Sequence, residues 1–100
     1  MGVKVCKFGG SSVADAGQLR KVKAIVESDP SRRIVVVSAP GKRSSSDTKI
    51  TDLLYLCHEH VKQGLPFDDV FSIIAERYRE IVRELGLSLR LDAELVIESA

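Results

Sequence analysis

Two adjacent glycines, Gly9 and Gly10, separate a short apolar run at residues 3–6 from a helical pattern at residues 13–28. In a strand, glycine turn and helix taken in that order, the free amides of the first helical turn and the helix dipole favour an anion. Glycines have no Cβ atom, so a bulky anion can approach their amides closely. Lys7 precedes the pair, and two hydroxyl residues follow it. An ordinary turn with a solvated lysine would also fit two glycines alone, but the combination favours phosphate binding.

This turn differs from two common nucleotide-binding motifs. The sequence contains neither G-x-x-x-x-G-K-[ST], the Walker A loop, nor G-x-G-x-x-G, the dinucleotide fingerprint. Any phosphate site here is therefore of another kind.

The first half of the chain predicts a strand, a helix and a second strand. Residues 3–8 form the first strand, with alternate side chains on opposite faces. The helix begins near Asp15, a good N-cap residue, and ends before residues 29–31. Residues 34–37 are four consecutive β-branched residues, which indicates a strand covered on both faces, as in parallel sheets. The three elements predict a right-handed βαβ unit.

This unit predicts where a ligand would bind. Parallel strands bring their carboxyl ends to one edge of the sheet, and open α/β sheets bind ligands there. Lys7, Gly9 and Gly10 are therefore expected to lie near residues 38–41, which follow the second strand. Residues 41–49 are rich in serine and charge, which predicts a mobile loop and, as a functional hypothesis, a flap over the site.

The second half predicts helices. One helix, capped by Asp47 or Thr48, is expected to run to about Gln63, with Gly64 as its stop signal. Pro66 opens another, which ends at Gly86, and a fourth is expected to begin at Asp92. The third helix has the clearest apolar stripe, which consists of Phe67, Val70, Phe71, Ile74, Tyr78, Ile81, Val82 and Leu85.

Composition excludes several classes of function. Fifteen basic and 14 acidic residues leave a net charge of +1, so nucleic acid and membrane are not expected as partners. No apolar run approaches ~20 residues, and there is no signal peptide, which suggests a cytoplasmic protein. Cys6 and Cys57 are expected as reduced thiols. His58 and His60 face different sides of a helix, so no metal ligand is assigned.

Two strands are a poor independent core, so the chain is expected to be the opening portion of a larger α/β layer fold. Residues 7–15, K-F-G-G-S-S-V-A-D, resemble the N-terminal motif of the aspartokinases, in the amino-acid kinase superfamily. Residues 35–39 and 49–54 are also similar to that family. The resemblance implies an αβα layered fold with a mainly parallel sheet. Residues 1–100 would be the N-terminal part of the catalytic domain, without its remainder or the regulatory ACT domains.

The resemblance also implies roles for single residues. Lys7 would be catalytic, contacting ATP phosphate and stabilising the transferring phosphoryl group. Ser38 and Thr51 would hold the substrate aspartate. The implied ATP phosphate-binding residues are Lys7, Phe8, Gly9, Gly10, Ser11 and Ser12.

The implied activity is phosphorylation of the aspartate side chain by ATP and Mg²⁺ to 4-phospho-L-aspartate, the first step of lysine, threonine and methionine biosynthesis, in a homo-oligomeric enzyme. The family's downstream Ser-x-Gly-Glu segment is missing, since residues 98–100 do not match it, so these 100 residues are expected to be inactive alone. Two alternatives stay open. One is a kinase of glutamate or N-acetylglutamate, and the other is a non-catalytic module that binds anions or a partner.

Overall fold

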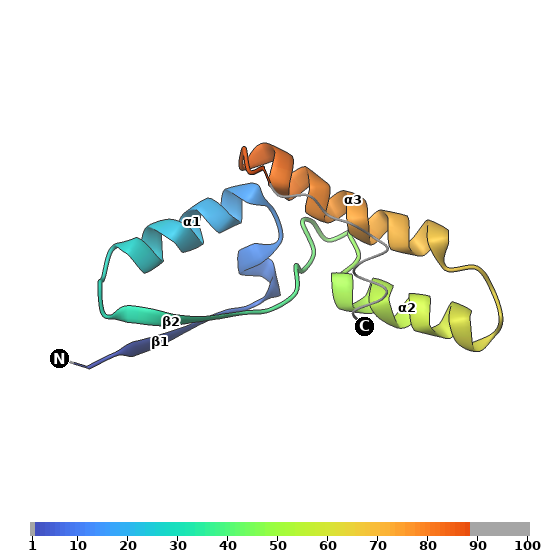
Figure 1. Ribbon diagram of the computed structural model, residues 1–100, viewed down its shortest axis with the longest axis horizontal. Coiled ribbons are helices and arrows are strands. Elements are labelled where there is room, and N and C mark those ends of the chain that lie inside the picture. Colours follow the sequence, from blue (N-terminus) through green and yellow to red (C-terminus); the bar gives the residue numbers. More distant parts are fainter. Residues whose placement is uncertain (1, 89–100) are drawn as a thin grey trace. The chain divides into compact units, whose positions relative to one another are not determined.

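A computed structural model describes residues 2–88, so the helix predicted from Asp92 lies outside the described residues. The chain folds as two compact units, and the boundary between them falls within one helix, between Leu53 and Leu54. In chain order the elements are β1 (Lys4–Phe8), a 3₁₀ helix η1 (Gly10–Val13), α1 (Ala16–Glu27), β2 (Arg32–Val37), α2 (Ile50–Lys62) and α3 (Asp68–Glu84) (Figure 1).

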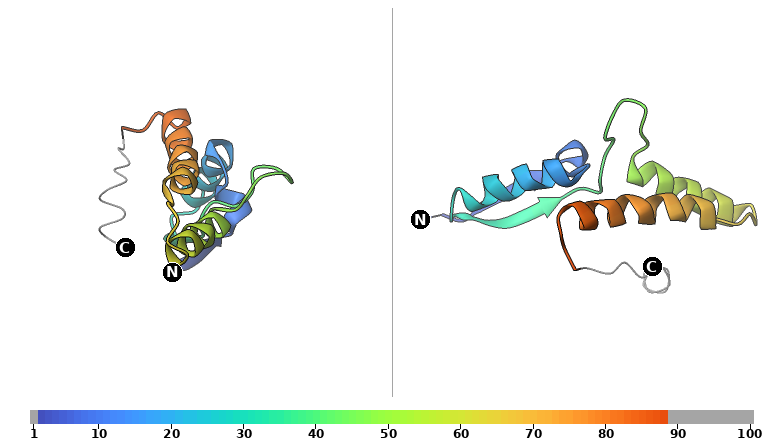
Figure 2. Two further views of the ribbon diagram at one scale, coloured as in Figure 1. Left: turned by 90° about the vertical axis from the view of Figure 1, so that its right-hand side faces the viewer. Right: turned by 90° about the horizontal axis from the view of Figure 1, so that it is seen from above.

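The strands β1 and β2 pair in parallel, and α1 connects them and runs along the sheet (Figure 2). Phe8 is paired with Val37 at the end of both strands, and the Ser38 amide donates a 3.0 Å hydrogen bond to the Phe8 carbonyl. The predicted βαβ order is thus confirmed. The segments that follow the two strands leave the sheet at the same edge.

The glycine pair does not lead directly into α1, as the pattern at residues 13–28 had suggested. It leads into η1, whose Ser12 amide bonds to the Gly9 carbonyl at 3.1 Å. The longer helix starts only after Asp15, whose side chain accepts a 2.8 Å hydrogen bond from the Gln18 amide. The predicted N-cap is therefore confirmed. The Asp15 carboxylate thus already accepts a hydrogen bond from one of the free amides at the start of α1.

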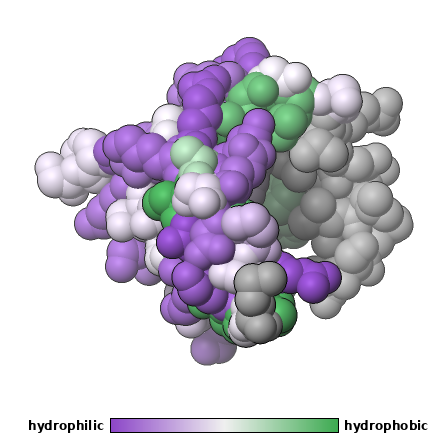
Figure 3. All heavy atoms as spheres, turned by 90° about the vertical axis from the view of Figure 1, so that its left-hand side faces the viewer, coloured by the Kyte–Doolittle hydropathy of each residue, from purple (hydrophilic) through white to green (hydrophobic). Residues whose placement is uncertain are grey.

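The second strand is less covered than its β-branched run predicts. Among residues 2–88, β2 has one neighbouring strand, and its side chains from Ile34 to Val37 remain between 42% and 57% exposed. Figure 3 shows one face of the molecule, on which apolar side chains lie between hydrophilic ones. The prediction of a strand covered on both faces is wrong for the described part of the chain.

The start of α2 lies one or two residues later than a cap at Asp47 or Thr48 predicts. The helix begins at Ile50, and the Asp47 side chain accepts hydrogen bonds from Arg43. Its end agrees with the prediction, since Gly64 has a positive φ of 71° and the following Leu65 amide bonds back to the His60 carbonyl at 2.8 Å.

The helix α3 buries much of its predicted stripe. Val70, Ile74 and Ile81 are buried, and the helix ends before Gly86, whose φ is 68°. Ala75 and Arg77 are also buried, at 2% and 4% exposure, although neither belongs to the predicted stripe. The buried face is therefore broader than the stripe of large apolar residues. No helix within residues 2–88 has the length and apolar character needed to cross a bilayer.

Candidate functional site

The segments that leave β1 and β2 touch each other through their backbones. The Gly41 amide donates a 2.8 Å hydrogen bond to the Gly10 carbonyl oxygen. A Cβ atom on Gly41 would lie 2.8 Å from the Gly10 carbonyl carbon, and one on Gly10 would lie 3.1 Å from the Ala39 oxygen. The contact therefore requires residues without side chains at both crossing positions.

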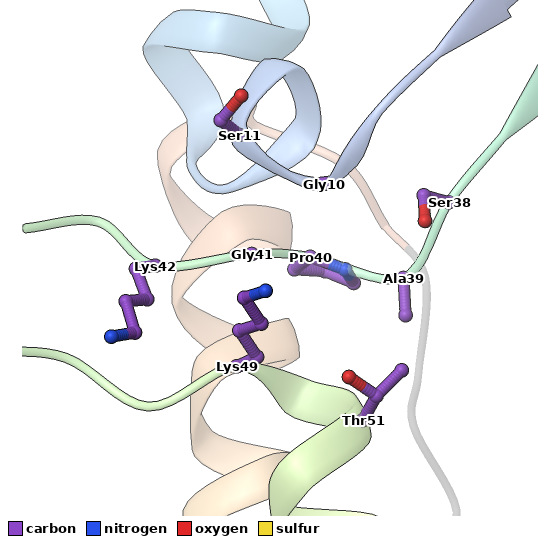
Figure 4. A pocket seen from close by; sticks show the side chains of 9 residues that line it. All are labelled: Gly10, Ser11, Ser38, Ala39, Pro40, Gly41, Lys42, Lys49 and Thr51. Atoms are coloured by element: carbon purple, nitrogen blue, oxygen red, sulfur yellow. The ribbon is translucent and has the colours of Figure 1, made fainter.

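A cavity of about 370 Å³ opens beside this crossing. The first residues of α2 complete it, since the Ile50 amide donates a 3.1 Å hydrogen bond to the Pro40 carbonyl. Figure 4 shows its lining, which comes from three segments of the chain. The lining residues are Gly10, Ser11, Ser38, Ala39, Pro40, Gly41, Lys42, Lys49 and Thr51.

The cavity brings together four of the residues that the sequence singled out. Gly10 and Ser11, expected to bind phosphate, line it together with Ser38 and Thr51, expected to bind aspartate. Three of the lining residues, Ser11, Ser38 and Thr51, thus carry hydroxyl groups. None of the three makes a side-chain hydrogen bond within residues 2–88.

The other predicted site residues lie beside the cavity and not in its lining. Lys7 is exposed on β1 opposite Val36, on the same side of the strand as Val5, which is 64% exposed. Phe8 and Ser12 are half-buried. Lys7 is therefore a solvent-accessible charge at the strand's end.

The two glycines of the motif have different surroundings. Nothing lies within 4 Å of the position that a Cβ atom would take on Gly9, whereas the corresponding space at Gly10 is bounded by the backbone of residues 39 and 41. The absence of a side chain at Gly10 thus allows the two backbones to cross. At Gly9 there is free space, so a phosphate could approach its backbone closely.

Two lysines in the lining were not predicted as site residues. Lys42 and Lys49 stand at the two ends of the polar loop, and their neighbours Gly41 and Ile50 anchor the loop through the hydrogen bonds described above. Both anchors are contacts between residues distant in the sequence, so residue spacing does not single out the two lysines.

Asp47 is the only carboxylate in residues 38–51, and it is already bonded within the loop. Its Oδ2 accepts hydrogen bonds from the Arg43 amide at 2.9 Å and from Arg43 Nε at 2.7 Å. Its Oδ1 accepts one from Arg43 Nη2 at 3.1 Å. Lys42 and Lys49 form no ion pair with any residue of the described part. The cavity therefore has an uncompensated positive charge, which suits an anion.

The same residues do not form a cation site. Within residues 2–88 there is no group of three or more His, Cys, Asp or Glu side chains arranged to hold a metal ion. The donors in the lining are backbone amides, hydroxyls and ammonium groups, which suit phosphate or carboxylate oxygens.

A parallel βαβ unit with a cavity at the carboxyl edge of its sheet defines a protein of the α/β class, in which ligands bind at that edge. No family model matches the chain. It is 51% identical over 85 residues to aspartokinase 3 of Bacillus subtilis, an alignment that covers 85% of the chain and 19% of that protein. It is 34% identical over 90 residues to lysine-sensitive aspartokinase 3 of Escherichia coli, covering 82% of the chain and 18% of that protein.

The fold agrees with these relatives. The crystal structure of Clostridium acetobutylicum aspartate kinase matches 99% of the chain, and 22% of its own chain, with a TM-score of 0.88 and 54% identity. The resemblance of its motifs to the aspartokinases is confirmed, since the chain matches a part of an aspartokinase in both sequence and fold. It spans about a fifth of the length of the relatives that it matches.

Proposed function

We propose that the complete protein is an aspartate kinase, which transfers the γ-phosphoryl group of ATP to the side-chain carboxylate of L-aspartate. The product is 4-phospho-L-aspartate, from which lysine, threonine and methionine are made. The observation that carries the proposal is the cavity. There, Gly10 and Ser11 of the phosphate motif lie together with Ser38 and Thr51, the residues expected to hold the acceptor.

For this phosphoryl transfer the protein mainly has to position the two substrates and supply positive charge. An oxygen of the aspartate carboxylate attacks the γ-phosphorus, the bond from that phosphorus to the β,γ-bridging oxygen breaks, and ADP leaves with the electron pair. A free carboxylate has a pKa near ~3.9, so at pH 7 it is already ionised and needs no general base. Phosphoryl transfer depends instead on amide donors and positive charge around the phosphoryl oxygens.

The residues of the motif would share this work. The open backbone at Gly9 would admit the phosphate chain, the Ser11 and Ser12 hydroxyls would donate to it, and Lys7 would meet the charge that develops on the transferring group. Mg²⁺ bound with the ATP would neutralise part of the charge on its phosphates.

The wider organisation is part of the same proposal. Residues 1–100 would form the N-terminal part of the catalytic domain, followed by its remainder and by regulatory ACT domains. The complete enzyme would act in the cytoplasm as a homo-oligomer. The domain arrangement is supported by the share of its relatives that the chain covers, which is about a fifth.

A comparison of acceptors tests the proposal. The complete protein is assayed for ADP release and for trapping of the acyl phosphate by hydroxylamine, with aspartate, glutamate and N-acetylglutamate as acceptors. Aspartate is expected to have the highest kcat/KM. A preference for either other acid would contradict the proposal, and phosphate binding without turnover would identify a non-catalytic anion-binding module.

A further inference from the structure

We propose that Lys42 and Lys49 bind the anionic phosphoryl acceptor, and that the loop between them exists to bring both charges to the cavity. The inference rests on the proposed function and names the groups that recognise its acceptor. Lys7 does not line the cavity and would contact the nucleotide. The site would then have positive charge in two separate places, with Lys7 near ATP and the two loop lysines near the acceptor.

The position of the two lysines carries the first step. They come from opposite ends of the loop and line the same cavity as Ser38 and Thr51 (Figure 4). Backbone hydrogen bonds fix the residue next to each lysine, from Gly41 to Gly10 and from Ile50 to Pro40. Both side chains therefore start from anchored backbone, although the loop between them contains no helix or strand.

The charge balance of the loop also supports the proposal. Arg43 and Asp47 bond to each other through three contacts of 2.7 to 3.1 Å, which uses the one carboxylate that the loop contains. Lys42 and Lys49 are left without a counter-ion within residues 2–88. Two like charges beside one cavity repel each other, and an anion bound between them removes that repulsion.

Size and chemistry indicate the class of ligand. A volume of about 370 Å³ is at the lower end of the range for small-molecule pockets and suits a small acid better than a whole nucleotide. Two ammonium groups and the hydroxyls of Ser38 and Thr51 match an acid with two carboxylates. An acceptor carboxylate must also approach the γ-phosphate, another anion, and nearby positive charge lowers that electrostatic barrier.

Substitution of each lysine in the complete protein tests this inference. Lys42→Met and Lys49→Met keep the length of the side chain and remove its charge. Each is expected to raise the aspartate KM, and the aspartate Kd measured by calorimetry without turnover, by ~10-fold or more. The ATP KM is expected to stay unchanged. Lys21→Met, an equal loss of charge on the exposed side of α1, is the matched control and should change neither constant.

Salt dependence supplies a second readout. A double variant combines Lys42→Met with Lys49→Met. If charge on these lysines holds the acceptor, the aspartate Kd of the wild-type protein rises more steeply with ionic strength than the aspartate Kd of this double variant. Equal slopes, or an unchanged aspartate Kd in both single variants, would overturn the inference. So would a rise confined to the ATP KM, since the lysines would then hold the nucleotide. A wild-type protein that does not phosphorylate aspartate would instead refute the proposed function.

Discussion

Gly10 and Gly41 cross at backbone contact distance, and this crossing joins the segment after β1 to the segment after β2. The Gly41 amide bonds to the Gly10 carbonyl at 2.8 Å, and neither residue has room for a Cβ atom without movement of the other backbone. The cavity lies directly beside the crossing. Its shape therefore depends on two residues that carry no functional group.

Gly41→Ala should disturb the fold. The added methyl group would meet backbone atoms of Gly10 and Ser11 at 2.8 to 3.0 Å, and backbone cannot rotate away as a side chain could. We expect the free energy of unfolding, measured by urea denaturation, to fall by ~1–3 kcal/mol. Gly17→Ala in α1 is the control, since its methyl group would meet only Asp15 Oδ1 at 3.4 Å. That variant should be slightly more stable than the wild type.

Gly9→Ala should separate phosphate approach from folding. Gly9 has φ −74°, which any residue adopts, and no atom lies within 4 Å of the new methyl group. The melting temperature is therefore expected to stay the same. If the phosphate approaches the Gly9 amide as proposed, the methyl group would obstruct it, and the ATP KM of the complete protein should rise. An unchanged ATP KM would remove the Gly9 amide from the phosphate site.

Much of the fold follows from local signals in the sequence. Asp15 caps α1 because its carboxylate reaches an amide three residues away, and Gly64 ends α2 because the chain adopts a positive φ there. Such signals act within a few residues, so they can be seen in one sequence. The sequence also predicts that four of the site residues lie close together, because parallel strands end at a common edge of the sheet.

The rest of the site depends on contacts between residues far apart in sequence. The crossing of Gly10 with Gly41 has no local signal, so Gly10 was predicted only as a phosphate contact. Similarly, two contacts distinguish Lys42 and Lys49 from ordinary loop lysines. Asp47 is bonded to Arg43, and the residues next to the two lysines form backbone hydrogen bonds to Gly10 and Pro40. Neither pairing can be read from residue spacing alone.

The far end of the sheet provides a test of pH dependence. Hydrogen bonds from Lys4 Nζ at 2.6 Å and from the Ser31 hydroxyl and amide hold the pKa of Asp29 well below its ordinary value of 3.8. The unfolded chain therefore takes up a proton at a higher pH than the folded chain does. The pair stabilises the fold above the ordinary pKa, and this contribution is lost as the pH falls through the lower, folded pKa.

Asp29→Asn should accordingly flatten the acid limb of the stability curve. The urea midpoint of the variant is expected to decline less than that of the wild type between about pH 5 and pH 2. Asp52→Asn, at an exposed carboxylate that has no partner within residues 2–88, serves as the control and should keep the wild-type slope. Equal slopes for all three proteins would show that the Lys4–Asp29 pair does not contribute.

Lys7→Ala in the complete enzyme should affect the rate far more than acceptor binding. Lys7 is exposed at the end of β1 and outside the cavity that Ser38 and Thr51 line, so aspartate affinity should hardly change. If Lys7 meets the transferring phosphoryl group as proposed, loss of its charge is expected to raise the barrier for kcat by ~3–4 kcal/mol, by analogy with lost oxyanion donors. Steady-state kinetics with both substrates varied checks this. An unchanged kcat would exclude Lys7 from the mechanism.

Thr51→Val should affect the acceptor alone. Thr51 is the second residue of α2 and lines the cavity, and its hydroxyl makes no hydrogen bond within residues 2–88. The hydroxyl is thus not engaged with its own helix, the usual structural role of a threonine near a helix start. Valine keeps the β-branched shape and removes only the donor.

The aspartate KM should therefore rise by the equivalent of one hydrogen bond to a charged group, ~1.5–3 kcal/mol, with little change in the ATP KM or in stability. Thr51→Ser, which keeps the hydroxyl, is the matched control and should retain an aspartate KM close to that of the wild type. A valine variant with the wild-type aspartate KM would mean that the hydroxyl faces solvent during turnover and that Ser38 and the two lysines hold the acceptor without it.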